Sequence, residues 1–169
     1  MPRLSPHRSD WAGIFMTEAR AIRDVAGGAV ALHHIGSTAV PDLLAKPVID
    51  ILGVADDRSA AEALARPLVA SGYEAKGAYG IEGRWYFRRD DADGRRLIHL
   101  HVFVVGSPHI ERHLAFRDYL RAHPDRAAAY GALKRRLARA PDYQQAKAGF
   151  VGELEAEALA WRRGVGTIG

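Results

Sequence analysis

A strand-like stretch of the chain ends in Gly36 and Ser37, which are residue types that can hold an anion. A glycine at this point lets the backbone approach a ligand closely, and the Ser37 hydroxyl can donate a hydrogen bond to a phosphate oxygen. Amide groups that follow, beginning at Thr38, add the positive end of a helix dipole if a helix starts there. The phosphate-loop motif GxxxxGK[ST] and the motif GxGxxG are both absent. We therefore expect an anion cradle at Gly36, Ser37 and Thr38.

An acidic residue, Asp50, lies inside the apolar stretch 47–54, which has the composition of a buried strand. Burial of a carboxylate is costly unless the group is paired, hydrogen-bonded or bound to a metal ion. The twelve residues 38–49 separate Ser37 from this acid. Asp50 is therefore a candidate site residue whose partner has to be found elsewhere in the chain.

Two histidines, His99 and His101, are spaced two apart in a later strand-like stretch. Alternation along a strand places both imidazoles on one face of the sheet, with the apolar residues that alternate with them on the other. With His34 and Asp50 nearby they could form a transition-metal site, because neutral imidazole suits zinc, iron or nickel. The alternatives are contacts with phosphates or acids, or a structural role.

Two basic residues and one further acid are placed where they could complete such a site. Lys46 precedes the Asp50 strand and could contact a phosphate near Ser37. Arg84 opens an alternating basic and aromatic segment, so its face either lines a cleft or is a solvated outer face of the sheet. Glu82, in a glycine-flanked turn, is a possible second metal ligand.

The elements that must position these residues follow from hydrophobic periodicity and turn residues. An amphipathic helix begins after Ser9, its expected N-cap, and ends before Gly27. A second helix is expected over 59–71, and Asp90–Gly94 forms a hairpin turn. Proline at the first helical position marks the start of three C-terminal helices, at Pro108, Pro124 and Pro141. The expected strands cover 30–35, 47–54, 73–76, 84–89 and 97–105.

The composition is that of one soluble α+β domain over residues 1–169. The chain has 48% hydrophobic residues and no cysteine, which excludes disulfides, thiolate nucleophiles and cysteine-ligated metal sites. No apolar stretch is long enough to span a membrane and no secretory signal pattern is visible, so a cytoplasmic location is expected. The net charge of +4 arises after residue 108 and does not indicate nucleic-acid binding.

A Gly-Ser turn followed at this distance by a strand acid resembles the signature of the nucleotidyltransferase superfamily of the DNA polymerase β type. More specifically, residues 34–41 and 45–51 resemble the GrpB family of bacterial proteins, and three further blocks at 99–102, 116–121 and 130–134 agree with it. The resemblance implies a nucleotidyltransferase-like mixed sheet with an N-terminal helix and a C-terminal three-helix segment. It also implies that Gly36 and Ser37 hold nucleotide phosphates and that Asp50 holds a divalent metal.

The chain departs from the superfamily pattern at the second metal-binding carboxylate. The superfamily supplies an acid-x-acid pair on one strand and a third acid on a neighbouring strand. Here Leu52 occupies the second position, and His99 and His101 lie on the neighbouring strand. A single Mg²⁺ held by Asp50 and substrate phosphates is compatible with this set, since magnesium often uses one or two carboxylates. Mn²⁺ and Zn²⁺ are the alternatives.

Three functional hypotheses follow. The first is a nucleotidyltransferase that binds a nucleoside triphosphate, with Ser37 and Asp50 in catalytic roles and Lys46 and Arg84 neutralising phosphate charge. The second is a non-catalytic nucleotide-binding or accessory module linked to coenzyme A metabolism, because the GrpB module also occurs appended to dephospho-coenzyme A kinase. The third is a histidine-rich metal-dependent hydrolase. The first two predict a nucleotide or another phosphorylated small molecule as ligand, whereas the third predicts a bound transition metal.

Overall fold

A computed structural model describes residues 3–166, and these form two compact units. The first, which we call the sheet unit, comprises residues 9–35 and 48–110. The second, which we call the helical unit, comprises residues 3–8, 36–47 and 111–166. The single domain expected from composition stays a prediction, and each unit is described by itself.

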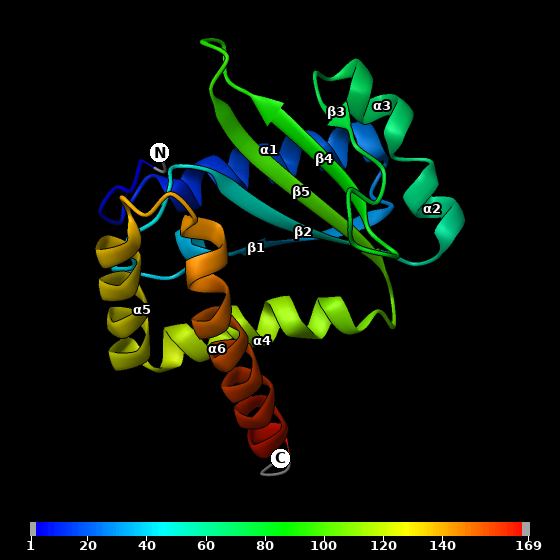
Figure 1. Ribbon diagram of the computed structural model, residues 1–169. Coiled ribbons are helices and arrows are strands. Elements are labelled where there is room, and N and C mark those ends of the chain that lie inside the picture. The colour runs from blue at the N-terminus through cyan, green and yellow to red at the C-terminus, as the bar shows by residue number, and fades with distance from the viewer. Residues whose placement is uncertain (1–2, 167–169) are drawn as a thin grey trace. The chain divides into compact units, whose positions relative to one another are not determined.

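The sheet unit is built on a five-stranded mixed sheet in the order β1-β2-β5-β4-β3 (Figure 1). The pairing of β2 with β5 is parallel, and the remaining pairs are antiparallel. The parallel pair places two strands distant in sequence side by side at the centre of the sheet. The strands are β1 (Val30–Ile35), β2 (Ile49–Ala55), β3 (Glu74–Ala75), β4 (Trp85–Asp90) and β5 (Arg96–Val104).

One face of this sheet is apolar and is covered by α1 (Trp11–Ala26), which lies behind the strands in Figure 1. Alternation places Ile51 and Leu100 on that face, and both are fully buried. Burial of such side chains supplies the main stabilisation of a sheet packed against a helix. The opposite face is therefore free to carry polar residues from the same strands.

The helix expected over 59–71 is two short helices, α2 (Arg58–Glu62) and α3 (Ala65–Ala70). The prediction of one continuous helix was wrong because Pro67 lacks an amide hydrogen for the Ala63 carbonyl and restricts the residue before it. The N-cap expected at Ser9 also differs, since α1 follows Asp10 and ends at Gly27, whose φ is 65°. The hairpin turn between β4 and β5 is confirmed, with the Asp91 carboxylate accepting from the amides of residues 93 and 95.

The helical unit contains the three expected C-terminal helices, α4 (Pro108–Ala122), α5 (Pro124–Leu137) and α6 (Tyr143–Gly166), although residues 108–110 count with the sheet unit. Ser107 caps α4 as expected, since its hydroxyl accepts from the His109 amide at 3.3 Å. The third helix begins two residues after the expected Pro141. These helices share a core with the turn at 36–47. Its buried members are Val40, Leu43, Ala115, Tyr119, Leu120, Ala127, Tyr130, Leu154 and Ala158.

The predicted fold class is confirmed: a mixed sheet preceded by a helix and followed by a three-helix segment. Within residues 3–166, no helix combines the length and apolar character needed to cross a bilayer.

Candidate functional site

The polar face of the sheet unit brings Asp50, His99 and His101 together. Asp50 lies on β2 directly beside His99 on the parallel strand β5, and His101 follows two residues later on the same face. The Nδ1 atom of His99 and the Nε2 atom of His101 each lie 3.3 Å from the same oxygen, Oδ1 of Asp50. The sequence-predicted association of these three residues is therefore confirmed by the strand register.

The two imidazoles control the ionisation of Asp50. Burial raises the pKa of Asp50, whereas hydrogen bonds from His101 and His99 lower it. The net effect holds the pKa of this carboxyl well below its ordinary value of 3.8. Asp50 is thus a carboxylate at neutral pH, and its side chain remains 31% exposed. It can accept a hydrogen bond or bind a metal ion without first being deprotonated.

Arg84, just before β4, orients one of these imidazoles. Its Nη1 atom lies 3.3 Å from Nδ1 of His101. Because arginine only donates, Nδ1 of His101 must be the accepting nitrogen, and the ring proton is therefore on Nε2, which faces Asp50. Arg84 also donates locally, through Nε and Nη2 to the carbonyls of Ala78 and Tyr79. Arg84 thus positions His101, and its contact with a phosphate stays a prediction.

The donor set at Asp50 can be compared with what different metals prefer. One carboxylate oxygen and two imidazole nitrogens lie within 4.8 Å of one another. Imidazole nitrogens suit zinc, iron or nickel, whereas magnesium prefers oxygen ligands in near-octahedral geometry. Leu52 faces the same way, opposite His101, and is fully buried, so the second position of an acid-x-acid pair is apolar. The set fits a transition metal through all three residues, and magnesium only through Asp50.

The Gly36-Ser37 turn belongs to the helical unit. Gly36 has φ 73° and ψ −172°, a conformation that a residue with a β-carbon rarely adopts. The helix expected to start here is a 3₁₀ helix of three residues, Ser37–Ala39, which is too short for a substantial dipole. Thr38 is buried. The positive charge at this turn comes instead from another element.

That charge is supplied by Lys134, which extends from α5 to the Ser37 hydroxyl. The ammonium group of Lys134 donates to Oγ of Ser37 and, at 3.0 Å, to the carbonyl of Leu44. It also lies 4.3 Å from the centre of the Tyr130 ring. Only 3% of Lys134 is exposed, so its charge acts in a poorly hydrated environment. The helical unit thus holds a cation on the hydroxyl that was expected to bind phosphate.

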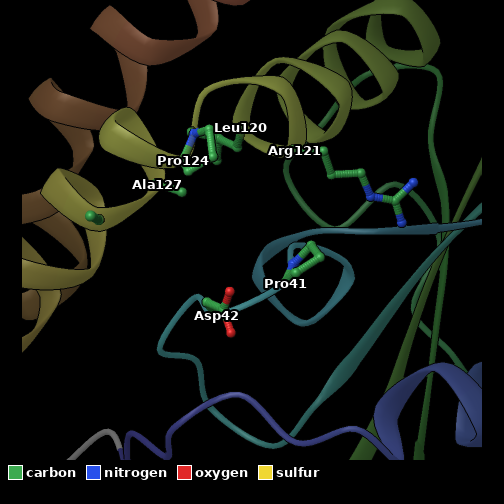
Figure 2. A pocket seen from close by; sticks show the side chains of 7 residues that line it. Pro41, Asp42, Leu120, Arg121, Pro124 and Ala127 are labelled. Atoms are coloured by element: carbon green, nitrogen blue, oxygen red, sulfur yellow. The ribbon is translucent and has the colours of Figure 1, made fainter.

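A shallow pocket lies next to this turn in the helical unit, where Pro41 and Asp42 face Leu120, Pro124 and Ala127 (Figure 2). Arg121 borders the pocket and donates through Nε to the carbonyl of Ala39 at 2.8 Å. Burial lowers the pKa of Arg121, and the nearby Arg117 charge lowers it further. The arginine therefore ties α4 to the turn that carries Ser37.

Comparison with known proteins assigns the chain to a family. The model of the GrpB protein family matches residues 1–157. The chain belongs to the GrpB family. The UPF0157 protein YqkA of Bacillus subtilis is 40% identical over 164 residues, covering 94% of this chain and 47% of that protein. This GrpB chain therefore spans about half the length of that relative.

Solved structures extend the comparison to the fold. A crystal structure of GrpB from Enterococcus faecalis matches with a TM-score of 0.87 and 36% identity, covering 95% of this chain and 99% of that one. The Cid1 poly(U) polymerase with Mg and 3′-dATP matches with a TM-score of 0.60 and 14% identity, covering 79% of this chain and 43% of that one. At that identity the likeness to Cid1 concerns the fold alone.

One expectation for this GrpB chain was wrong, and one candidate ligand lies outside the Asp50 cluster. His34 was expected near Asp50, but the strand register places it on the other face of the sheet, where it stacks on Phe15 at 5.0 Å. Glu82 is exposed in the turn before β4 and is not in the group that could hold a metal among the described residues.

Two lysines of the GrpB chain, Lys134 and Lys46, have surroundings that the sequence did not predict. In the sequence Lys134 belongs both to a basic cluster on a helix and to the GrpB-like block at 130–134, where it could either bind a ligand or hold the helices together. Lys134 lies four positions after Tyr130, on the same helix face. If the aromatic ring packs in the core, the lysine beside it is expected to be buried as well. Lys46 is half-buried with its ammonium 5.4 Å from the centre of the Tyr143 ring, within the helical unit.

Proposed function

We propose that this GrpB chain is a nucleotidyltransferase that binds a nucleoside triphosphate together with a divalent metal ion. The observation that carries the proposal is the buried Lys134 ammonium on the Ser37 hydroxyl, at a turn where Gly36 leaves the backbone open to a close approach. The likeness of the fold to Cid1, which is a poly(U) polymerase, supports the same reaction class.

In this proposal the helical unit binds phosphate. The Ser37 hydroxyl donates to a phosphate oxygen, and the fixed positive charge of Lys134 lies beside it. A cation in a poorly hydrated place stabilises negative charge more strongly than one in water. Gly36 keeps the space that a side chain would fill, Thr38 contributes through its backbone, and Lys46 adds a second cation within the same unit.

The sheet unit supplies the ionised Asp50. In the reaction, an acceptor oxygen forms a bond to the α-phosphorus, and the bond from that phosphorus to the oxygen leaving with pyrophosphate breaks. A divalent ion, Mg²⁺ or Mn²⁺, would neutralise phosphate charge when bound. Asp50 would hold it, while His99 and His101 fix the position of the carboxylate. The His101 ring is in turn oriented by Arg84.

A second candidate function is a nucleotide-binding accessory module without catalysis. Two observations favour it: Leu52 is buried where a second carboxylate would be needed, and a dephospho-CoA kinase of Mycolicibacterium paratuberculosis is 32% identical over 157 residues. The match covers 39% of that kinase, as expected for a module within a longer enzyme. The third hypothesis, a histidine-rich hydrolase, rests on the donor set of Asp50, His99 and His101. It predicts stoichiometric zinc or iron in the purified protein by elemental analysis.

The experiment that tests the proposal is a series of melting temperatures with each nucleoside triphosphate, with and without Mg²⁺ or Mn²⁺. A ligand that binds the folded state must raise the melting temperature. Wild type is compared with Ser37→Ala and Asp50→Ala, and Ser59→Ala serves as the matched exposed serine.

We expect a metal-dependent rise that both site variants lose and Ser59→Ala keeps. A rise that ignores metal and Asp50 would favour the accessory module. No rise with any nucleotide would reject both nucleotide-binding functions.

A further inference from the structure

The most unusual exposed side chain of the sheet unit is Tyr79, in the loop that joins β3 to β4. The residue is 57% exposed, and its backbone has φ 46°, in the left-handed region. That region is disfavoured for residues with a β-carbon and is found where the surrounding structure enforces it, often at functional sites. Arg84 enforces it here by donating to the carbonyl of Tyr79 at 2.8 Å and to that of Ala78 at 3.1 Å.

Tyr79 forms a stacked aromatic pair with Tyr86 of β4. The ring centres are 5.4 Å apart and the planes differ by 17°. Tyr86 continues toward the candidate site, since its ring is 5.4 Å from that of His101 and 4.6 Å from the Arg84 guanidinium. An exposed aromatic surface is therefore connected, ring by ring, to the Asp50 cluster within one unit.

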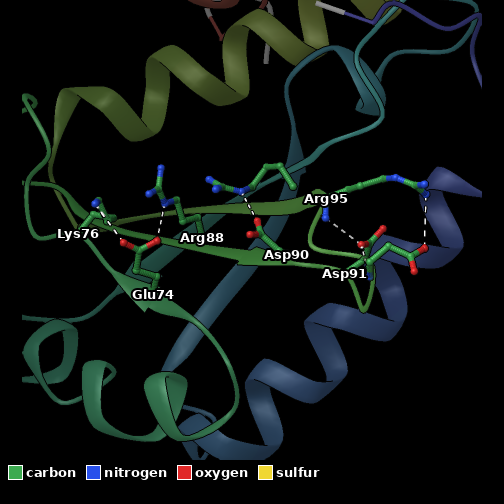
Figure 3. A network of polar contacts seen from close by, with 8 residues as sticks. Glu74, Lys76, Arg88, Asp90, Asp91 and Arg95 are labelled. Atoms are coloured by element: carbon green, nitrogen blue, oxygen red, sulfur yellow. Dashed lines mark hydrogen bonds and ion pairs between the residues drawn. The ribbon is translucent and has the colours of Figure 1, made fainter.

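Cations surround this aromatic pair. The ammonium of Lys76 lies 5.1 Å and the guanidinium of Arg88 6.0 Å from the centre of the Tyr79 ring. Figure 3 shows Glu74 between these two, bonded to Lys76 at 3.1 Å and to Arg88 at 2.7 Å. With Arg84 over the Tyr86 ring, three cations lie next to the two rings, and Glu74 pairs with two of them, Lys76 and Arg88. A purely apolar partner would gain nothing from these charges, whereas a ligand with a planar ring and phosphates would use both features.

We propose that the Tyr79-Tyr86 pair is a stacking platform for a base of a single-stranded oligonucleotide, whose phosphates contact Lys76 and Arg88. The inference rests on the proposed function, because it names the acceptor class for that reaction. An open aromatic surface flanked by cations binds bases by stacking and follows a phosphate backbone, and it tolerates different sequences. The openness of the Tyr79 ring favours a strand over a single nucleotide, which needs an enclosed base pocket to bind tightly.

The test is direct binding of a fluorescein-labelled ten-nucleotide RNA, followed by fluorescence anisotropy without triphosphate. Wild type is compared with Tyr79→Phe, which keeps the ring, and with Tyr79→Ala, which removes it. Met16→Ala is the matched control, because Met16 is an equally exposed apolar residue of the same unit. Tyr79→Gly preserves the left-handed backbone, so it separates loss of the ring from collapse of the loop.

We expect Tyr79→Ala and Tyr79→Gly to bind roughly tenfold more weakly, with Tyr79→Phe and Met16→Ala within about twofold of wild type. Arg88→Gln should reduce the slope of log K against log salt by about 0.7, the value for one lost phosphate contact to a single strand. Equal binding by wild type and Tyr79→Ala would overturn the inference. So would a free nucleoside monophosphate that competes as well as an unlabelled RNA.

The outcomes separate this inference from the proposed function. A metal-dependent nucleotide response without any RNA binding would overturn the stacking platform and leave the nucleotidyltransferase proposal intact. Tyr79-dependent RNA binding without a nucleotide response would support the platform and reject the transferase reaction.

Discussion

The Asp50 cluster of the sheet unit and the Lys134-Ser37 pair of the helical unit place charge in opposite ways. Asp50 is an anion held between two imidazoles that come from one neighbouring strand. Lys134 is a cation held by oxygen acceptors that lie 97 and 90 positions earlier in the sequence. The first arrangement follows from strand alternation and register. The second requires α5 to pack against the turn at Ser37, which is distant in the sequence.

The two sites should respond differently to substitution because different groups stabilise their charges. On the sheet, the side chain beside the cluster is the fully buried Leu52, so the carboxylate is supported by apolar packing on one side. At the turn, the Lys134 charge is stabilised by a hydroxyl, a carbonyl and an aromatic ring. We therefore expect substitutions around Asp50 to affect folding and metal affinity together, and those at Lys134 to affect mainly nucleotide affinity.

The largest effect is expected from Leu52→Asp, which creates the missing acid-x-acid pair. Loss of a buried leucine and burial of a second carboxylate should together lower the free energy of unfolding by about 5 kcal/mol. Mg²⁺ or Mn²⁺ should restore part of this stability, because the ion would neutralise both acids. Urea denaturation with and without metal measures the effect, and Leu52→Ala is the control without a charge. Identical metal responses of the two variants would contradict the assigned strand face.

Asp50→Asn should separate charge from shape at the same cluster. The amide keeps the size of the side chain but removes the anion, so affinity for metal in the presence of triphosphate should fall by at least about 100-fold. Isothermal titration calorimetry measures this affinity. Asp90→Asn, an exposed acid on β4 paired with Arg96, should bind metal as wild type does. A loss in Asp90→Asn of equal size would show that general surface charge, and not Asp50, holds the ion.

Lys134→Met tests whether the charge of this side chain binds the triphosphate in the helical unit. Methionine retains the buried stem and removes the charge, so triphosphate affinity should fall by about 30-fold, the equivalent of one charge-assisted hydrogen bond. The neighbouring exposed Arg135→Met changes the net charge equally and should leave affinity within about twofold. Binding of a fluorescent triphosphate analogue measures both. Equal losses in the two variants would reduce the role of Lys134 to its contribution to overall charge.

The smallest effect concerns the Glu74 network beside the aromatic pair (Figure 3). Hydrogen bonds from Arg88 and Lys76 lower the pKa of Glu74 to about 2 from its ordinary value of 4.5. A depressed pKa contributes stability above pH 4.5 that is lost as the pH falls toward 2. The stability difference between wild type and Glu74→Gln should therefore shrink over that range in urea denaturation. A constant difference from pH 5 to pH 2 would contradict the pairing.

The sequence predicted much of the sheet unit because the relevant signals are local. Strand alternation predicted His99 and His101 on one face and the alternating apolar residues, such as Leu100, on the other, and the strand register confirms it. Alternation describes one strand at a time, so it does not predict which strands are neighbours in the sheet. The sequence therefore put His34 near Asp50, whereas the register of β1 with β2 turns that ring to the other face.

Periodicity, turn residues and motif spacing are properties of short segments, and they were enough to predict the α+β class, most element boundaries and the GrpB resemblance. Three contacts could be found only in the folded chain: Lys134 with Ser37, Arg84 with His101, and Tyr79 with Tyr86. In each contact, the two partners do not lie on the same helix or strand, so hydrophobic periodicity does not predict it. Their positions depend on loop paths and packing of whole elements, and these are determined by the core as a whole and not by any one segment.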